Sequence, residues 1–501
     1  MTHSFRFWLL ILLLTGCART PQSGVNLVNK YHDATVRQIG TAQDERNAAA
    51  LLPFLSNANP TYRREAALAL ASVQAPAAGP GLVPLLRDFD PGVRRAAAYA
   101  LGQIGDSTAV DSLKVRVLRE PDGAVRRYVH EALGRTITRR RLPELWGGPE
   151  ASSDTARAAA LAWGLSRAAL RGLSSPESIR RTVQLLNSPK LPAHARLAVV
   201  AGLARSRGLE ADLAQLAEAT LLRVALEDLS PTVRAAAATT LGKIAAYVPT
   251  AVPSANTAAP VAKPATGPAA VLAQLATKDA DYRVRLSALR ALSFGAATYS
   301  ASRAAVFSAL KNDQALVALT AAEWLLAHAQ GESGATLAVL ADGNKQASPR
   351  VRAALLQAAV HHANAAARPS LTETIRKRYS AAPTVYEKGF LLQALAEDPA
   401  SFDFVRTEAF APGQSSVVAG YALAALLAIR RHANFPAARR PDFAAAMRQA
   451  LATGDVAQLG TAAEALADAK LYPEAQPADL AALRQAQAKL QLPREIEAWQ
   501  G

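Results

Sequence analysis

Side chains that could perform metal, acid–base or nucleophilic chemistry are few and scattered along the chain. There are eight histidines, and no two lie four residues apart, the spacing at which helical histidines share a metal ion. His361 and His362 are adjacent, so on a helix they point about 100° apart and cannot chelate one ion together. The sequence contains neither a Walker-type phosphate loop nor a Gly-x-Ser-x-Gly nucleophile motif. We therefore expect no catalytic residue, metal, cofactor or small-molecule substrate.

Arginine is the one residue type with a reactive or charged side chain that clusters in the sequence. The chain has 56 basic and 40 acidic residues, a formal net charge of +16. Four arginines lie within seven residues, at Arg135, Arg139, Arg140 and Arg141. Such a cluster can contact phosphates or anionic glycans, or it can be a solvated helix face. We retain it as a possible anion-binding site for glycan or lipid.

The single cysteine, Cys17, follows a short apolar run at the N-terminus. Arg6 precedes the run Phe7–Leu14, which is too short to span a bilayer but suits a secretory signal. The tetrapeptide at residues 14–17, Leu-Thr-Gly-Cys, resembles the lipobox of bacterial lipoprotein precursors. This resemblance implies a signal peptide over residues 1–16, cleaved before Cys17, and acylation of that cysteine. More than one acyl chain would anchor the mature protein stably.

The residue after the cysteine bears on the destination of the lipoprotein. It is Ala18 and not aspartate, which is similar to lipoproteins sorted to the outer membrane. We expect a lipid-anchored protein of the cell envelope, facing the periplasm, with residues 17–29 as a flexible tether. No nucleic-acid partner is expected, because an exported lipoprotein does not meet the chromosome.

The apolar composition favours helices. Half of the residues are hydrophobic but only 6% are aromatic, and alanine and leucine supply most of the apolar side chains. These two residue types have high helix propensity and allow close packing of helices. An all-β fold would need more β-branched and aromatic residues.

A recurring pattern places an arginine directly after an anchor residue that is usually apolar. The stretch Pro91-Gly92-Val93-Arg94 illustrates it, and the first anchors are 31 or 32 residues apart. A leucine usually follows eight residues after the anchor, which returns to the same helical face. The arginines in this position are Arg63, Arg94, Arg126, Arg157, Arg196, Arg234, Arg285 and Arg352.

Each repeat is predicted to be a helical hairpin. Within Gly81–Gly105, a first helix is followed by Asp90-Pro91, a good N-cap and first position for a second helix. This alternation resembles the HEAT repeat family. The resemblance implies an all-α solenoid of about 11–12 HEAT-like helical hairpins. Repeats without the marker are predicted near residues 317–324, 386–395, 418–426 and 458–466.

The predicted organisation has two arrays of repeats. Residues 30–248 form the N-terminal array and residues 269–492 a degenerate C-terminal one, with a tail at 493–501. Between the arrays, residues 249–268 are rich in proline, alanine and threonine. Such a stretch is typical of a linker or an insertion.

We assign a structural role to the repeated arginines. Each falls in the first turn of a helix, where its charge opposes the helix dipole, and acidic residues such as Asp90 and Asp228 stand just upstream. The similar Asp/Arg pattern of HEAT proteins forms a ladder between adjacent repeats, so the resemblance implies the same here. Ligand binding by these arginines stays open as the alternative.

Three functions follow as hypotheses. The first is a non-catalytic, membrane-anchored scaffold that binds an envelope protein or peptide on the concave face of the solenoid. The second uses a resemblance of the N-terminal half to envelope lipoproteins of bacteroidete type that carry a cyclophilin domain after HEAT repeats. The cyclophilin motifs are absent here, so this chain would be the HEAT portion of a proline-isomerase or chaperone system without its catalyst. The third is a basic surface for anionic glycan or lipid.

Overall fold

A computed structural model describes most of the repeat region. The described residues are 30–146, 154–188, 190–206, 209–245, 267–293, 299–312, 314–329, 332–343, 348–453, 456–468 and 477–487. The predicted signal peptide (1–16), Cys17 with its tether (17–29), nearly all of the 249–268 insertion and the 493–501 tail lie outside these ranges.

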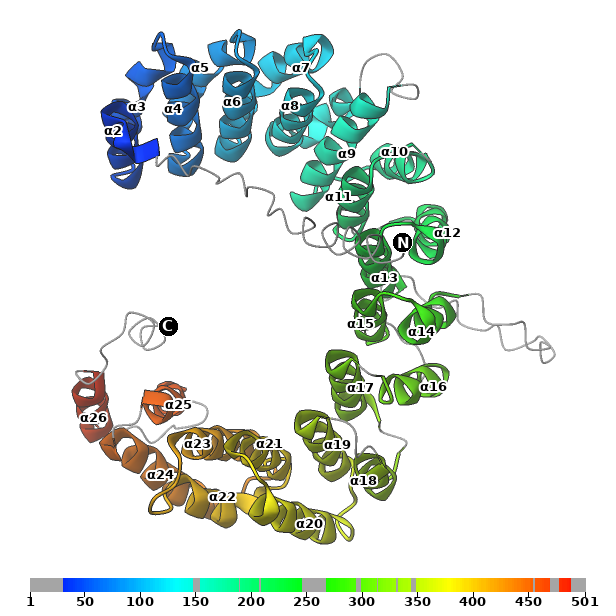
Figure 1. Ribbon diagram of the computed structural model, residues 1–501, viewed down its shortest axis with the longest axis vertical. Helices are drawn as coiled ribbons and strands as arrows, with labels where there is room; N and C mark the ends of the chain where they lie inside the picture. The colour runs from blue at the N-terminus through cyan, green and yellow to red at the C-terminus, as the bar shows by residue number, and fades with distance from the viewer. Residues whose placement is uncertain are drawn as a thin grey trace, which may run out of the picture. The chain divides into compact units, whose positions relative to one another are not determined.

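The described residues form helices and no strand, which confirms the all-α prediction (Figure 1). The chain divides into two compact units, residues 1–164 and 165–501, and the division falls within α9. The helices of the first unit are α2 (Ala34–Asp44), α3 (Ala48–Leu51), α4 (Pro60–Val73), α5 (Gly79–Leu82), α6 (Pro91–Ile104), α7 (Val110–Arg119), α8 (Gly123–Thr136) and the start of α9 (Thr155–Leu170).

The second unit continues the alternation of helices. Its members after α9 are α10 (Pro176–Leu186), α11 (Ala193–Leu203), α12 (Ala211–Glu227), α13 (Pro231–Ala245), α14 (Pro268–Lys278), α15 (Tyr282–Ala291), α16 (Tyr299–Ala309), α17 (Ala315–His328), α18 (Gly334–Gly343), α19 (Pro349–His361), α20 (Arg368–Ala381), α21 (Val385–Leu395), α22 (Phe402–Ala409), α23 (Ser416–Arg431), α24 (Arg440–Thr453), α25 (Val456–Ala467) and α26 (Pro477–Gln487). Helices α17, α21, α23 and α25 cover the four repeats that lack the marker, as predicted.

Short 3-10 segments join or extend several helices. They are η1 (Lys30–His32), η2 (Leu52–Ser56), η3 (Pro76–Ala78), η4 (Pro84–Arg87), η5 (Ser107–Ala109), η6 (Arg139–Leu145), η7 (Pro399–Ser401) and η8 (Ala437–Arg439).

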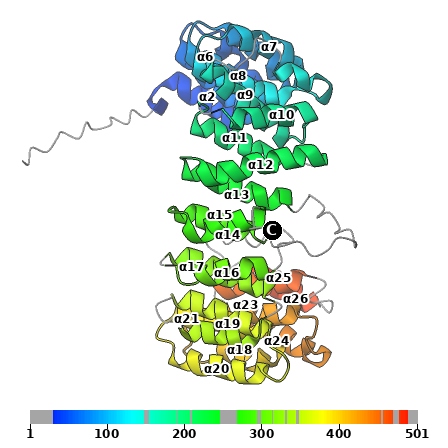
Figure 2. The ribbon, with the colours of Figure 1, turned by 90° about the vertical axis from the view of Figure 1, so that its right-hand side faces the viewer.

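Each repeat pairs a first helix (A) with a second (B), and the B helices stack on one another. In the first unit α4 packs on α6 and α6 on α8. In the second unit the B layer runs from α11 to α25 through the odd-numbered helices, each packed on the next. Figure 2 shows α12 to α17 lying across the direction in which the repeats of this unit succeed one another. This is the layer arrangement of an α-solenoid.

The ends of a B helix follow the chemistry expected for the Asp-Pro start. The Asp90 carboxylate accepts a hydrogen bond from the amide of Val93 at 2.9 Å, and Pro91 occupies the first turn of α6. Gly105 ends this helix in the left-handed region, with φ of 75°. Inside the helix, a Cβ on Gly102 would lie 2.9 Å from the Cα of Ala132 on α8. Glycine thus permits the close approach of two successive B helices.

The core consists of small and branched aliphatic side chains. The repeated leucines that follow the anchors by eight residues are buried in every repeat where they occur. These leucines are Leu70, Leu101, Leu133, Leu203, Leu241 and Leu292.

One expected A helix is broken. The sequence predicts a continuous helix from Gly81 toward Asp88, but α5 ends at Leu82 and the 3-10 segment η4 begins at Pro84. Proline has no amide hydrogen and its ring clashes with the carbonyl four residues earlier, so the α-helix cannot pass through it.

The repeats on both sides of the 249–268 stretch pack directly on each other. Helices α12 and α13, before it, contact α14, and α13 also contacts α15. The arrays 30–248 and 269–492 stay a prediction as domains; the compact units divide elsewhere, between residues 164 and 165.

Candidate functional site

Each arginine of the repeated motif joins two adjacent repeats. Arg63, on α4, donates two hydrogen bonds to the carboxylate of Asp88 in the next A–B link, at 2.7 and 2.9 Å. Its third nitrogen donates to the carbonyls of Asn57 and Ala58, in its own link, at 2.8 and 2.9 Å. The arginine therefore holds its own hairpin together and binds the following one.

The same two-sided arrangement recurs along both units, and we call it the arginine ladder. Its ion pairs are Arg63–Asp88, Arg94–Glu120, Arg126–Asp154, Arg196–Asp228, Arg234–Asp279 and Arg352–Glu387. Several of these arginines also donate to a carbonyl six residues earlier: Arg94 to Asp88, Arg126 to Glu120 and Arg234 to Asp228.

The carboxylates of the ladder serve their own link as well. Asp88 accepts a hydrogen bond from the amide of Asp90 at 2.9 Å, and Asp228 from that of Ser230 at 2.8 Å. These acids lie two residues before the residue at the N-cap position. The backbone hydrogen bond already restricts the rotamer of each carboxylate, so the ion pair with arginine costs less side-chain entropy.

Burial and ion pairing shift the pKa values of the ladder residues in opposite directions. Burial raises the pKa of Asp88, but the hydrogen bonds from Arg63 and the Asp90 amide outweigh it and leave the pKa below its usual value. The pKa of Glu120 is lowered in the same way, against its burial, by Arg94 and Arg116. The hydrogen bond to Asp228 raises the pKa of Arg196. These pairs stay ionised near neutral pH.

The sequence analysis located the arginines and acids just upstream of them, but not which acid pairs with which arginine. Asp228 accepts from Arg196 as a ladder residue. Asp90, placed in the ladder by the sequence, instead caps α6, and the partner in that link is Asp88. Asp88 and Asp154 are among the acids upstream of the arginines, but each pairs with the arginine of the preceding repeat; Glu120, Asp279 and Glu387 were not predicted as partners. An acid two residues before the cap would have identified Asp88, Glu120 and Asp279.

Two of the predicted ladder arginines lie in different surroundings. Arg285 meets an amide in place of a carboxylate, because Asn312 stands where other links have an acid, and the distance is 3.5 Å. Arg157 lies in the first turn of α9, where its amide donates to Asp154 at 3.1 Å.

The predicted anion-binding cluster does not present four available cations. Arg141 donates to the carboxylates of Asp111 and Glu144, and the hydrogen bonds from Arg141 and Lys114 lower the pKa of Glu144 to about 2. Arg135 donates to the amide oxygen of Gln103 at 3.4 Å. Arg139 and Arg140 are exposed on η6.

A different group of arginines, one position after the ladder, lies on the exposed side of the B helices of the first unit. The Arg127 guanidinium is 4.8 Å from the ring centre of Tyr128 and 5.2 Å from that of Trp163. Arg95 lies 5.9 Å from the ring of Tyr128, and Tyr99 meets this ring edge-on at 6.1 Å. We call Arg95, Tyr99, Arg127, Tyr128 and Trp163 the B-face stripe.

The cations of this stripe have no carboxylate partner. Within the described residues neither Arg95 nor Arg127 takes part in an ion pair, and the buried Nε of Arg127 donates no hydrogen bond. Tyr99 is 37% exposed and Arg95 is exposed, while the other three are half-buried. Tryptophan, tyrosine and arginine are the residue types enriched among the few interface residues that contribute most of the binding energy between proteins.

Three histidines of the described residues, His130, His362 and His432, hydrogen-bond to backbone carbonyls, and His361 bonds to the carboxylate of Glu397. His362 donates to the carbonyls of Leu325 and Leu326 at 3.0 and 2.9 Å, and buried His130 donates to that of Arg126 at 3.0 Å. Over the described part of the chain no group of three or more potential metal ligands occurs. Nor is any helix in those ranges long and apolar enough to cross a membrane.

The comparisons with known proteins agree with the repeat assignment. The family model for HEAT repeats matches residues 48–134 and 79–166, so HEAT repeats are present in this part of the chain. Together with the stacked hairpins, this defines the protein as an α-solenoid that contains HEAT repeats. No curated protein matches the chain.

The chain is also similar, at low sequence identity, to some solved structures. One is the karyopherin Kap121p bound to the extreme C-terminus of the protein phosphatase Cdc14p, with 12% identity, a TM-score of 0.49, and coverage of 89% of this chain and 53% of that one. Another is Kap121p bound to Nup53p, with 13% identity, a TM-score of 0.49 and coverage of 89% and 53%. This chain spans about half the length of those karyopherin chains.

Proposed function

We propose that this protein is a non-catalytic scaffold of the cell envelope, anchored by lipid on Cys17, that binds a protein or peptide partner along its B helices. A solenoid with HEAT repeats offers a long continuous surface, and such surfaces are typical of protein recognition. The lipobox-like sequence at Cys17 supports the anchor and a periplasm-facing position at the outer membrane.

The B-face stripe is the observation that carries the binding proposal. It joins three successive B helices, α6, α8 and α9, with two cations that no carboxylate of the described residues neutralises. Arg127 lies between two aromatic rings, so its side chain is held in place before a partner arrives. Pre-ordered side chains lose little entropy on binding, which favours affinity.

The test is affinity capture from detergent-solubilised envelopes with the mature chain as bait. We expect a protein partner in stoichiometric amount, retained by the Arg94→Gln chain below its unfolding temperature and lost with Arg95→Gln or Tyr99→Ser. A partner retained equally by all three variants would place binding elsewhere. Recovery of no protein would contradict the scaffold.

The isomerase alternative is separated by an enzymatic assay. If the chain only serves as a scaffold, a proline-containing peptide isomerises in its presence at the uncatalysed rate, which has a time constant of roughly 10–100 s. A rate that increases in proportion to the concentration of the chain would contradict the non-catalytic proposal.

The structure gives less support to a glycan or lipid surface at Arg135, Arg139, Arg140 and Arg141. Arg141 is already shared between two carboxylates of the same unit. Binding of an anionic glycan that is lost with Arg139→Gln and Arg140→Gln would favour this alternative over protein recognition.

A further inference from the structure

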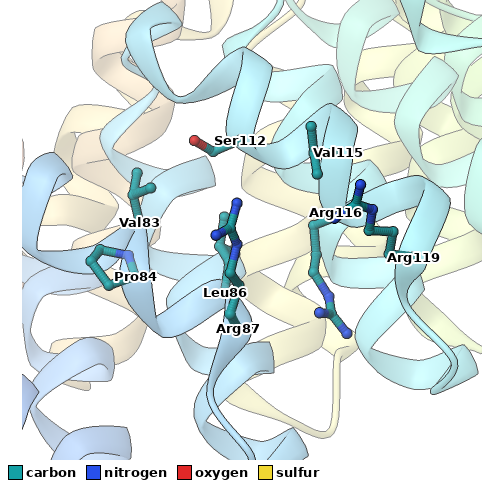
Figure 3. A pocket seen from close by; sticks show the side chains of 8 residues that line it. All are labelled: Val83, Pro84, Leu86, Arg87, Ser112, Val115, Arg116 and Arg119. Carbon is teal, nitrogen blue, oxygen red and sulfur yellow. The ribbon is translucent and has the colours of Figure 1, made fainter.

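A second feature of the first unit lies on its A helices. Between η4 and α7 is a cavity of about 520 Å³, within the roughly 300–1,000 Å³ typical of ligand pockets. Val83, Pro84 and Arg87 line one wall, and Ser112, Val115 and Arg119 line the other (Figure 3). We call it the A-side groove.

The broken A helix explains why a groove exists here. Pro84 ends the α-helical geometry after α5 and starts the short 3-10 segment η4. This segment has only four residues, against ten in α7. A short wall facing a longer helix leaves the side of α7 partly uncovered, and Val115 is 39% exposed there.

The groove is positively charged because three arginines and no carboxylate line it, and the nearby ladder acids already have partners. Glu120 is buried and paired with Arg94 and Arg116, and Asp88 is paired with Arg63. Arg116 therefore contributes its stem to the groove, while its guanidinium is held at 2.6 Å by Glu120.

Two cations remain for a ligand. Arg87 and Arg119 are exposed, and neither takes part in an ion pair or side-chain hydrogen bond within the described residues. In Figure 3 the Arg87 side chain lies between Val83 and Pro84 on one side and Val115, Arg116 and Arg119 on the other.

We infer that the A-side groove binds an acidic peptide segment of a partner protein, in which carboxylate and apolar side chains alternate. Carboxylates meet Arg87 and Arg119 in charge-assisted hydrogen bonds, which are about twice as strong as neutral ones. The apolar side chains cover Val83, Pro84 and Val115. A bare polyanion would use the two arginines but gain nothing from the apolar walls. This site is separate from the B-face stripe, so either can fail alone.

The experiment measures binding of a short fluorescein-labelled peptide of alternating glutamate and leucine to the detergent-solubilised full-length chain. The comparison peptide replaces glutamate by glutamine. We expect the acidic peptide to bind, the amide peptide to bind at least about tenfold more weakly, and the Arg87→Gln/Arg119→Gln chain to lose about tenfold or more. Val115→Glu, at an exposed position, weakens binding by placing a negative charge in the groove.

Matched controls decide the outcome. Arg140→Gln removes an exposed charge from the same unit outside the groove, and Arg95→Gln removes one from the B-face stripe; neither reduces binding. Equal loss with Arg140→Gln, equal binding of the two peptides, or no binding at all overturns the inference. Competition by a leucine-free polyglutamate peptide as strong as that of the acidic peptide also overturns it, because the apolar walls would then be irrelevant.

Discussion

The carboxylate of Glu120 accepts hydrogen bonds from two arginines that belong to two different repeats. Arg94, on α6, donates to it at 3.1 and 3.0 Å, and Arg116, on α7, at 2.6 Å. The side chain of Glu120 is fully shielded from solvent, and that of Arg94 is 11% exposed. A buried carboxylate is stable here only because both cations and the Asp122 amide surround it.

Removal of Arg94 should destabilise the first unit strongly. Arg94→Ala leaves Glu120 buried with one cation in place of two, and breaking one partner of a buried pair costs about 3–5 kcal/mol. We expect a lower unfolding midpoint by circular dichroism. The control Arg95→Ala, at the next and exposed position, should change the midpoint little, and an Arg94→Ala midpoint equal to the wild-type value would contradict the structural role.

The packing of α6 on α8 makes a second prediction. Gly102→Ala places a Cβ 2.9 Å from the Cα of Ala132, so the helices must separate, at a cost of about 1–3 kcal/mol. Gly460→Ala, on α25, meets no atom within 4 Å and should stabilise by about 0.5–1 kcal/mol through helix propensity. Thermal unfolding of both variants checks the opposite signs.

Buried His130 gives stability a pH dependence. Burial, helped by the charges of Arg126 and Arg157, lowers its pKa to about 4, although the bond to the Arg126 carbonyl acts the other way. Between pH 6.5 and about 4, His130 binds a proton in the unfolded chain but stays neutral in the folded chain. The free energy of unfolding therefore falls as the pH falls. The loss approaches about 3 kcal/mol.

The matched variant is His130→Asn, which keeps a donor for the Arg126 carbonyl without titrating. From pH 6.5 to about 4.5 its free energy of unfolding should fall less steeply than that of the wild type; the slope that remains includes His328, whose pKa burial also lowers. Below this range the ladder carboxylates, whose pKa values are lowered, lose their pairing in both proteins. The same slope in both chains above pH 4.5 would show that His130 is not responsible.

The anchor at Cys17 stays a prediction and has its own test. In Cys17→Ser no thiol is available for acylation, so incorporation of labelled palmitate should disappear and the protein should move from the membrane to the soluble fraction. Wild-type protein that takes up no palmitate would contradict the lipoprotein assignment.

Much of the architecture could be predicted because its signals are local. The cap at Asp90, the proline after it and the arginine in the first turn all act within one helix start, and their recurrence gave the repeat. Local signals can identify candidate acids but not which arginine each one binds, because pairing joins distant residues: Arg63 lies 25 residues before Asp88, and Arg234 lies 45 before Asp279. Pairing over such distances depends on how one hairpin packs on the next.

The two proposed binding surfaces could not be predicted from the sequence either. Arg94 and Arg95 are adjacent and of one type, yet one is buried in the ladder and the other is exposed on the B face. Which of the two arginines is buried depends on how α6 is rotated about its axis relative to the neighbouring helices. The basic run from Arg135 to Arg141 offers fewer cations to a ligand than its sequence indicates, because Arg141 pairs with Asp111 of α7 and with Glu144, three residues further along η6.

This adjacent pair provides the most direct test of the scaffold proposal. Arg94→Gln and Arg95→Gln are compared for thermal unfolding and, at a temperature where both are folded, for capture of the envelope partner. We predict that Arg94→Gln lowers the midpoint and keeps the partner, whereas Arg95→Gln keeps the midpoint and loses the partner. An Arg95→Gln chain that still holds its partner as the wild type does would contradict binding through the B helices.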